Sequence, residues 1–137
     1  MKKFISIMLC AVLLIVGFET VAFASDTDAE IMPCYNNAAT INSNFNIVDG
    51  NAIVLTSYTG YQGMTTGARI TIQLQKRNLL VFWKDITEWV DVSYKEDAMF
   101  EHSYPVSSGT YRVKIRYEIS GSGGATDVIE EEIQASY

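Results

Sequence analysis

The sequence is poor in the side chains that carry most catalytic and metal chemistry. Its 137 residues include two cysteines and a single histidine, His102. A zinc site needs more cysteine or histidine than this. Nucleophilic catalysis needs a nucleophile beside a base, but Ser103 and His102 are neighbours that would point to opposite faces of a strand. We therefore expect no catalytic residues of this kind and no zinc.

Loop motifs for phosphate and calcium are absent as well. No glycine-rich loop follows a strand and opens a helix, and no D-x-D-x-D-G loop occurs. Carboxylates are frequent from residue 85 to residue 101, but Lys84 and Lys95 lie among them, which is typical of a solvated face. The sequence predicts no cofactor, no metal and no enzymatic activity. A calcium site, or a hydrolase built on Asp85, Glu88 and Asp91, stays open as an alternative.

Long apolar runs are absent except at the N-terminus. Met1-Lys2-Lys3 precedes a mostly apolar run from Phe4 to Phe18, and Ala22-Phe23-Ala24 supplies small residues at a cleavage site. These are the parts of a secretory signal peptide, and the run is shorter than the about 20 residues of a spanning helix. We predict a signal peptide over residues 1–24 and a secreted, extracellular protein with no stable membrane insertion after cleavage.

Cleavage after Ala24 changes the composition of what remains. The 113 residues that follow carry 15 acidic and 8 basic side chains, a net charge of −7. Nucleic acids and anionic membranes are bound through clusters of Lys and Arg, so the acidity argues against both as partners. Cys34 is the only remaining cysteine, which excludes an internal disulfide. Its thiol is either free or bridged to another molecule.

The chain after the signal peptide divides into a leader and a β domain. Residues 25–38 are polar and acidic without periodicity, and predict a flexible leader before a domain over residues 39–137. Two-residue alternation is typical of half-buried strands and runs through that domain. Strands are expected at 40–48, 52–58, 68–75, 98–106, 111–119 and 128–136, with a short hydrophobic run at 79–83. Residues 85–94 fit a strand or a helical turn.

Turn residues separate these segments. Asp49-Gly50 predicts a tight hairpin turn, and Lys76-Arg77-Asn78 is expected to turn the chain before the run that starts at Leu79. About seven short antiparallel strands without a disulfide favour an all-β sandwich. A barrel of the OB type is the alternative.

The last two strands predict their own register. If residues 111–119 and 128–136 pair with Tyr117 opposite Ile129, Arg116 faces Glu130 and Lys114 faces Glu132. A slip by one residue would turn the apolar set outward. The same register points Glu131 inward, so we expect its carboxylate near the rim or beside a partner.

The aromatic residues provide the candidate binding site. Exposed Trp and Tyr stack on sugars and anchor protein interfaces. Tyr58 and Tyr61 flank a loop that contains two glycines, where exposure is expected, and Trp89 adjoins the acidic stretch. We expect Phe82, Trp83 and Tyr117 in the core. The ligand-binding hypothesis therefore names Tyr58, Tyr61 and Trp89, with an extracellular protein or a glycan as the partner.

The segment Ser107-Ser108-Gly109-Thr110-Tyr111-Arg112-Val113 resembles the D-x-G-x-Y-x-C segment before strand F of immunoglobulin-like domains. Ser107 stands at the Asp position, and Val113 replaces the cysteine. The resemblance implies that Tyr111 is a tyrosine corner and that Trp83 is the core tryptophan of strand C. Because the sandwich cysteines are missing, the fibronectin type III-like branch is the closer likeness.

A second resemblance covers about residues 40–137. Leu74-Gln75-Lys76, a following Trp, the G-x-Y-R-V-K segment from Gly109 and a Glu-rich last strand are similar to small exported proteins of Gram-positive bacteria. This likeness implies no activity. The expected function is that of an exported, non-enzymatic module that acts through protein contacts or association with the cell envelope. A carbohydrate-binding module is the alternative.

Overall fold

The structure is a computed structural model that describes residues 34–79 and 81–137. The predicted signal peptide and the greater part of the predicted leader lie outside these residues. The described residues form seven strands and no helix: β1 Ala38–Val48, β2 Asn51–Gly60, β3 Thr65–Asn78, β4 Phe82–Ser93, β5 Asp97–Pro105, β6 Thr110–Gly121 and β7 Asp127–Ser136. A helix able to cross a membrane is therefore not found in this part of the chain.

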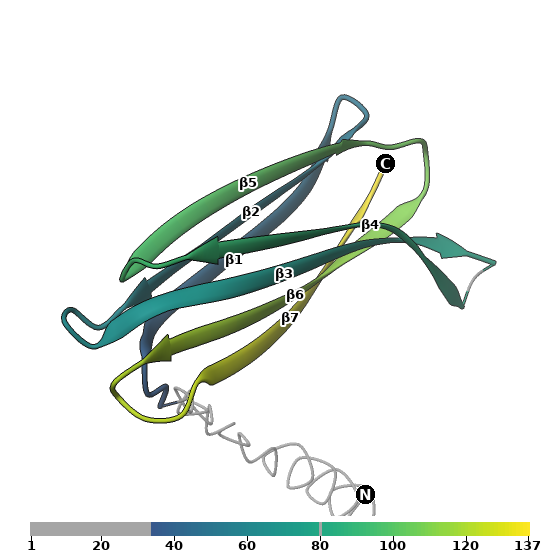
Figure 1. Cartoon of the computed structure of the whole chain (residues 1–137). Helices are drawn as coiled ribbons and strands as arrows, with labels where there is room; N and C mark the ends of the chain where they lie inside the picture. The colour runs from purple at the N-terminus through teal and green to yellow at the C-terminus, as the bar shows by residue number, and fades with distance from the viewer. Residues whose placement is uncertain (1–33, 80) are drawn as a thin grey trace, which may run out of the picture. The chain divides into compact units, whose positions relative to one another are not determined.

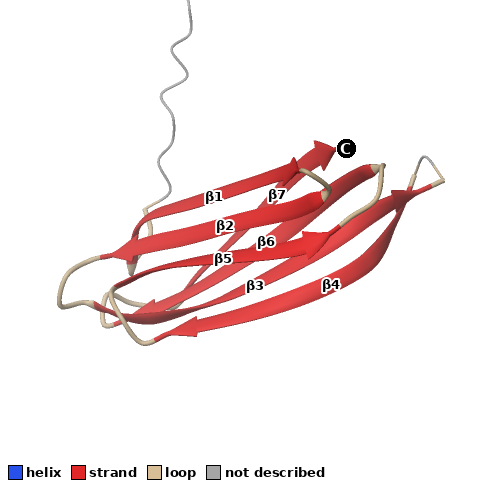
Figure 2. Cartoon of the chain, turned by 90° about the horizontal axis from the view of Figure 1, so that it is seen from above, coloured by secondary structure: helices blue, strands red, loops and turns tan. Residues whose placement is uncertain are grey.

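The seven strands form two antiparallel sheets. One has the order β1-β2-β5 and the other β4-β3-β6-β7, and the two lie face to face (Figures 1 and 2). The predicted all-β sandwich is confirmed, and the barrel alternative is wrong because the sheets stay separate. Residues 85–93 belong to β4, which pairs with β3 almost throughout its length, and Tyr94 follows the end of the strand. The strand interpretation of that stretch is therefore the correct one.

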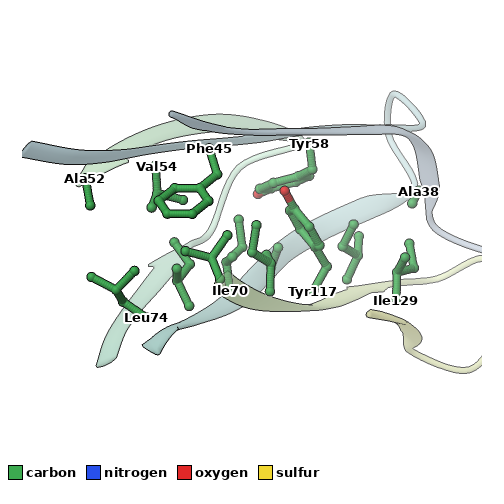
Figure 3. Close-up of a cluster of buried hydrophobic side chains, with 14 of the residues drawn as sticks. Ala38, Phe45, Ala52, Val54, Tyr58, Ile70, Leu74, Tyr117 and Ile129 are labelled. Atoms are coloured by element: carbon green, nitrogen blue, oxygen red, sulfur yellow. The ribbon is translucent and has the colours of Figure 1, made fainter. Parts of the chain in front are cut away.

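The core lies between the inner faces of the two sheets. The alternation in β3 and β6 buries every second residue, and each fully buried aliphatic side chain contributes about 1.5–3 kcal/mol at most. The buried members of these two strands are Ala68, Ile70, Ile72, Leu74, Tyr111, Val113, Ile115, Tyr117 and Ile119. Tyr58 and Tyr117 reach into the core from opposite sheets (Figure 3). Residues Pro33–Tyr137 form one compact unit, which contains this whole core.

Tyr117 ties β6 to β1 across the core. Its hydroxyl lies 2.6 Å from Ser43 Oγ and donates to the carbonyl oxygen of Asn42 at 3.2 Å. Burial raises the pKa of Tyr117 to about 12, and the nearby Glu131 carboxylate adds to this rise. The phenol therefore stays protonated well above the pH at which a solvated tyrosine ionises.

The register predicted for the last two strands is confirmed. Tyr117 faces Ile129, and Arg116 faces Glu130 with a 2.7 Å ion pair. Lys114 faces Glu132 as expected, although the carboxylate of Glu132 is bound by Arg112 at 3.1 Å. Glu131 is half-buried, and its Oε2 has no hydrogen-bond partner among the described residues.

A carboxylate at the start of β7 fixes the chain just before β1. Asp127 accepts hydrogen bonds from the backbone N–H groups of Asn36, Asn37 and Ala38, at 2.8, 2.6 and 2.9 Å. Burial acts to raise the pKa of Asp127, but these three donors outweigh it and hold the pKa below its ordinary value. The expected flexible leader therefore differs from the structure at residues 36–38, which are anchored. Cys34 is exposed and free among the described residues.

A tyrosine corner is defined by a hydrogen bond from the tyrosine hydroxyl to upstream backbone, and Tyr111 makes this bond. Its hydroxyl donates to the carbonyl oxygen of Ser107 at 2.8 Å. The role implied for Trp83 is wrong, because Trp83 lies on β4 rather than on the third strand and is half-buried on the outside of the sheet. The cause is that β3 carries no tryptophan and fills its core positions with aliphatic residues.

Candidate functional site

The β3–β4 hairpin extends beyond the ends of the neighbouring strands (Figures 1 and 2). Its last paired residues are Asn78 and Phe82, so Lys76-Arg77-Asn78 continues the strand and the expected turn there is wrong. The turn falls inside the short hydrophobic run at 79–83. Leu79 is 78% exposed, Val81 71% and Phe82 66%. These three residues are called the hairpin tip.

The backbone at the hairpin tip is strained. Leu79 has a φ of 47°, in the left-handed region that costs a side chain about 1–2 kcal/mol. Glycine is the residue that ordinarily takes this conformation in a turn. A bulky apolar residue with this conformation is an outlier, and outliers of this kind point towards a functional constraint.

Basic residues occupy the two residue pairs directly behind the hairpin tip. The next pair along the hairpin is Arg77 with Trp83, and the pair after that is Lys76 with Lys84. The first acidic residue comes one pair later, where Asp85 faces Gln75. Lys76, Arg77 and Lys84 are called the cationic collar. Half of the eight basic side chains that follow residue 24 lie here or beside Trp83, if Arg112 is included.

Trp83 joins the hairpin to the outer face of the larger sheet. The guanidinium carbon of Arg112 lies 4.3 Å from the Trp83 ring centroid, and that of Arg77 lies 5.0 Å away. Such cation–π contacts contribute about 0.5–1 kcal/mol at exposed sites. Arg112 is itself held, because its Nε donates to Gln75 Oε1 at 2.6 Å. These contacts therefore hold the base of the hairpin against the larger sheet.

A bulge explains why Gln75 is buried. The pairing of β3 with β4 shifts between Leu74 and Gln75, and both side chains are buried although alternation predicts one inside and one outside. The amide of Gln75 compensates for burial by donating from Nε2 to Asp85 Oδ1 at 2.6 Å. The bulge bends the hairpin where it leaves the sandwich.

The three aromatic residues predicted to bind a ligand are not brought together. Tyr58 is only 2% exposed, so its expected exposure is wrong, and its hydroxyl donates to the carbonyl oxygen of Lys95 at 2.7 Å. Burial raises the pKa of Tyr58. Tyr61 is 43% exposed, as expected. Trp89 is half-buried against the core.

Of the other residues expected in the core, Tyr117 is buried and Phe82 is exposed. Phe82 differs because it closes a hairpin that lies past the end of the opposite sheet (Figure 1). The sequence signal for the hairpin tip was present as an apolar run without a glycine. That signal is ambiguous because a buried strand has the same composition.

A polar contact that no sequence pattern indicates joins β4 to β5. His102 Nε2 lies 2.7 Å from Asp91 Oδ2, with 21% and 15% of the side chains exposed. The ring of Trp89 stacks on His102 with centroids 4.9 Å apart, and Tyr104 meets Trp89 edge-on at 6.5 Å. No hydroxyl or thiol of the described residues is hydrogen-bonded to His102. The arrangement therefore joins the two sheets and lacks a nucleophile.

A shallow depression of about 400 Å³ lies on the outer face of the larger sheet. Thr71, Gln73, Glu88, Lys114, Arg116 and Glu130 line it. Its charges are mixed, and Arg116 is bound to Glu130. No group of three metal-ligating side chains occurs in residues 34–79 and 81–137. Among these surfaces, the hairpin tip is the one that combines exposed apolar area, backbone strain and a distinct charge pattern.

No protein-family model matches the sequence, and no curated protein matches it. Solved structures of OgpA from Akkermansia muciniphila align with part of it. Two crystal structures of the wild-type protein have 10% and 8% identity, with TM-scores of 0.45 and 0.46 over 74% and 77% of this chain. A catalytically inactive OgpA in complex with an O-glycopeptide (glycodrosocin) substrate has 8% identity and a TM-score of 0.46 over 75%. The chain spans 30% of the length of each, and this likeness gives no information about activity.

Proposed function

We propose that this protein is an exported, non-enzymatic binding module that associates with the envelope of the producing cell through the hairpin tip. The observation that carries the proposal is the exposure of Leu79, Val81 and Phe82 at the end of a projecting hairpin. Exposed apolar patches cost solubility and commonly mark interaction sites. Export is supported by the signal-peptide pattern of residues 1–24.

The expected strength of this association is modest. Burial of three apolar side chains contributes at most about 1.5–3 kcal/mol each, and association itself costs several kcal/mol of lost freedom. A single hairpin tip therefore gives reversible docking. This suits a small module that is held near the cell surface and exchanges with the medium.

The sandwich behind the hairpin tip serves as its rigid scaffold. We assign it to the fibronectin type III-like branch of sandwich folds. The assignment is supported by the place of β4 beside β3 in the larger sheet and by the hydrogen bond between Tyr111 and Ser107.

Retention on the producing cell tests the proposal. Residues 25–137, which contain the compact unit Pro33–Tyr137, are added to washed cells, and the bound fraction is measured. The double variant Val81→Ser/Phe82→Ser should lose at least about tenfold in bound fraction, because two apolar anchors are removed. Met99→Ser is the matched control, since Met99 is 68% exposed on a different strand.

Equal retention of the double variant and the unchanged protein would contradict the proposal. Carbohydrate binding is the second candidate, favoured by the exposed ring of Tyr61 beside Gly63. In that case Tyr61→Ala, rather than the tip variant, would lose retention, and soluble envelope glycans would compete with binding.

A further inference from the structure

We propose that the partner of the hairpin tip is the surface of a lipid bilayer with anionic headgroups. This inference rests on the proposed function and names the partner of the same site. It is carried by the order of side chains along the β3–β4 hairpin, which runs from exposed apolar to aromatic and cationic to acidic.

The first step is the depth that each residue pair of the hairpin would reach in a bilayer. Strand residues rise by about 3.3 Å each, so the pair Lys76–Lys84 lies about 7 Å behind the pair Asn78–Phe82. Amphipathic segments bury their apolar part about 5–10 Å into the boundary between headgroups and acyl chains. When Leu79, Val81 and Phe82 enter the acyl region, the exposed Lys84 therefore reaches the level of the phosphates. The Lys76 ammonium at the same level donates to Ser107 Oγ at 2.7 Å.

The second step is the chemistry of the residue pair between the hairpin tip and the two lysines. Trp83 occupies the pair between the hairpin tip and the lysines, and tryptophan is enriched at membrane interfaces because its ring is amphipathic. Arg77 faces Trp83 across the hairpin. Both side chains stand where a bilayer changes from apolar to charged. The Arg77 guanidinium, which contacts the Trp83 ring at 5.0 Å, gains phosphate partners there that a purely apolar protein groove would not supply.

The third step is charge. The net charge of −7 after residue 24 argues against an anionic surface, but the hairpin distributes its charge unevenly. β3 contains no acidic residue, and Glu88 lies six residues behind Phe82 on β4, which is about 20 Å along the strand. Because salt screens charges beyond about 8–10 Å, a bilayer at the hairpin tip meets mainly the cationic collar. The first acid, Asp85, is hydrogen-bonded to Gln75.

Flotation with vesicles tests the inference. Residues 25–137 are mixed with vesicles of phosphatidylcholine containing about 30% phosphatidylglycerol, or with vesicles of phosphatidylcholine alone, and the floated fraction gives a partition coefficient. We expect partitioning into the anionic vesicles. It should fall at least about tenfold for Val81→Ser/Phe82→Ser.

Two further variants separate the contributions. Lys84→Gln removes one exposed charge of the cationic collar and should lower partitioning into anionic vesicles about fivefold, with little change for neutral vesicles. Met99→Ser should leave partitioning unchanged. Met99 lies near the start of β5, at the end of the sandwich where β4 finishes and therefore away from the hairpin tip. Thermal unfolding of each variant checks that the fold is intact.

The possible results either support the inference or overturn it. Lack of flotation, flotation that is equal for the tip variant, or flotation that is insensitive to Lys84→Gln and to salt would overturn it. If the tip variant loses retention on cells but no variant floats with vesicles, the binding function stands and the partner is not a lipid surface. If retention on cells does not depend on the hairpin tip, the proposed function itself is wrong, whatever the vesicles show.

Discussion

Asp49 and Leu79 adopt the same backbone conformation in two different hairpins, with φ values of 48° and 47°. In the β1–β2 hairpin, Asp49 is followed by Gly50 with a φ of 74°, and the two residues form the whole loop between Val48 and Asn51. Asp-Gly is a preferred pair for such a turn. In the β3–β4 hairpin the same conformation is imposed on a leucine that lies 78% exposed.

The two hairpins also differ in how they are attached. The start of the first is held by Asp127, and its strand β1 is bound through Ser43 to Tyr117 of the opposite sheet. The second projects past the sandwich and exposes its apolar residues. In the first hairpin, both the turn residues and the contacts of its strands favour folding. In the second hairpin, the leucine in the turn and the exposed apolar residues do not. Such departures are expected where a function other than folding selects the residues.

The largest effect is expected where the first hairpin is anchored. Asp127→Ala leaves three backbone N–H groups without their acceptor and should lower the free energy of unfolding by about 4 kcal/mol. Asp127→Asn keeps one oxygen acceptor and should lose less. Chemical denaturation measures both. Retention through the second hairpin should be unchanged at temperatures where the variants stay folded, and a parallel loss of retention would show that the two regions are not independent.

Acid should weaken the same anchor. The folded pKa of Asp127 lies below its ordinary value of 3.8, so the contribution of this carboxylate to stability is present above that pH. It is lost as the pH falls from there through the folded pKa. The difference in unfolding free energy between the unchanged protein and Asp127→Asn should therefore shrink in acid. A difference that stays constant down to acid pH would contradict the role given to the carboxylate.

A somewhat smaller effect is expected at alkaline pH, from the tie between β1 and β6. The folded pKa of Tyr117 is raised to about 12 from 10.0, so its contribution is present below pH 10 and is lost as the pH rises through the folded pKa. The loss should reach about 2–3 kcal/mol. Tyr117→Phe should remove this part of the alkaline decline, and stability curves for the two proteins that run parallel above pH 10 would contradict the assignment.

The smallest effect comes from exchanging the residues that the two turns place in the left-handed conformation. Asp49→Leu should lower the free energy of unfolding by about 1 kcal/mol, and Leu79→Asn should raise it by about as much. Thermal melts measure both changes. Leu79→Asn should also weaken retention on cells, because it removes part of the hairpin tip. Destabilisation by Leu79→Asn would mean that Leu79 packs in the fold rather than serving a partner.

Much of the fold was predictable because its signals are local. Alternation in Ala68 to Leu74 and in Tyr111 to Ile119 has period two, and each residue's face follows from its neighbours. The register of the last two strands followed because a slip by one would have exposed the apolar set. The hairpin turn at Asp49-Gly50 followed from the backbone freedom of those two residues.

The candidate site was not predictable in the same way. Tyr58 and Phe82 were assigned the wrong environments, since the exposure of an aromatic ring depends on which strand covers it. The contact between Asp91 and His102 joins strands of different sheets, and no pattern within either strand indicates it. The bulge at Gln75 shifts the alternation of inward and outward side chains. Alternation alone therefore does not predict which side chains at the end of β3 are buried.

The sequence by itself determined the strand content, the inward faces of β3 and β6, the pairing of β6 with β7, and one of the two contrasting turns. Only the tertiary structure decided that Leu79, Val81 and Phe82 project into solvent, with the cationic collar behind them. The physical reason is that an apolar run has the same local preferences whether it is buried or exposed. Its environment is set by how far the opposite sheet reaches, which is a property of the packed molecule.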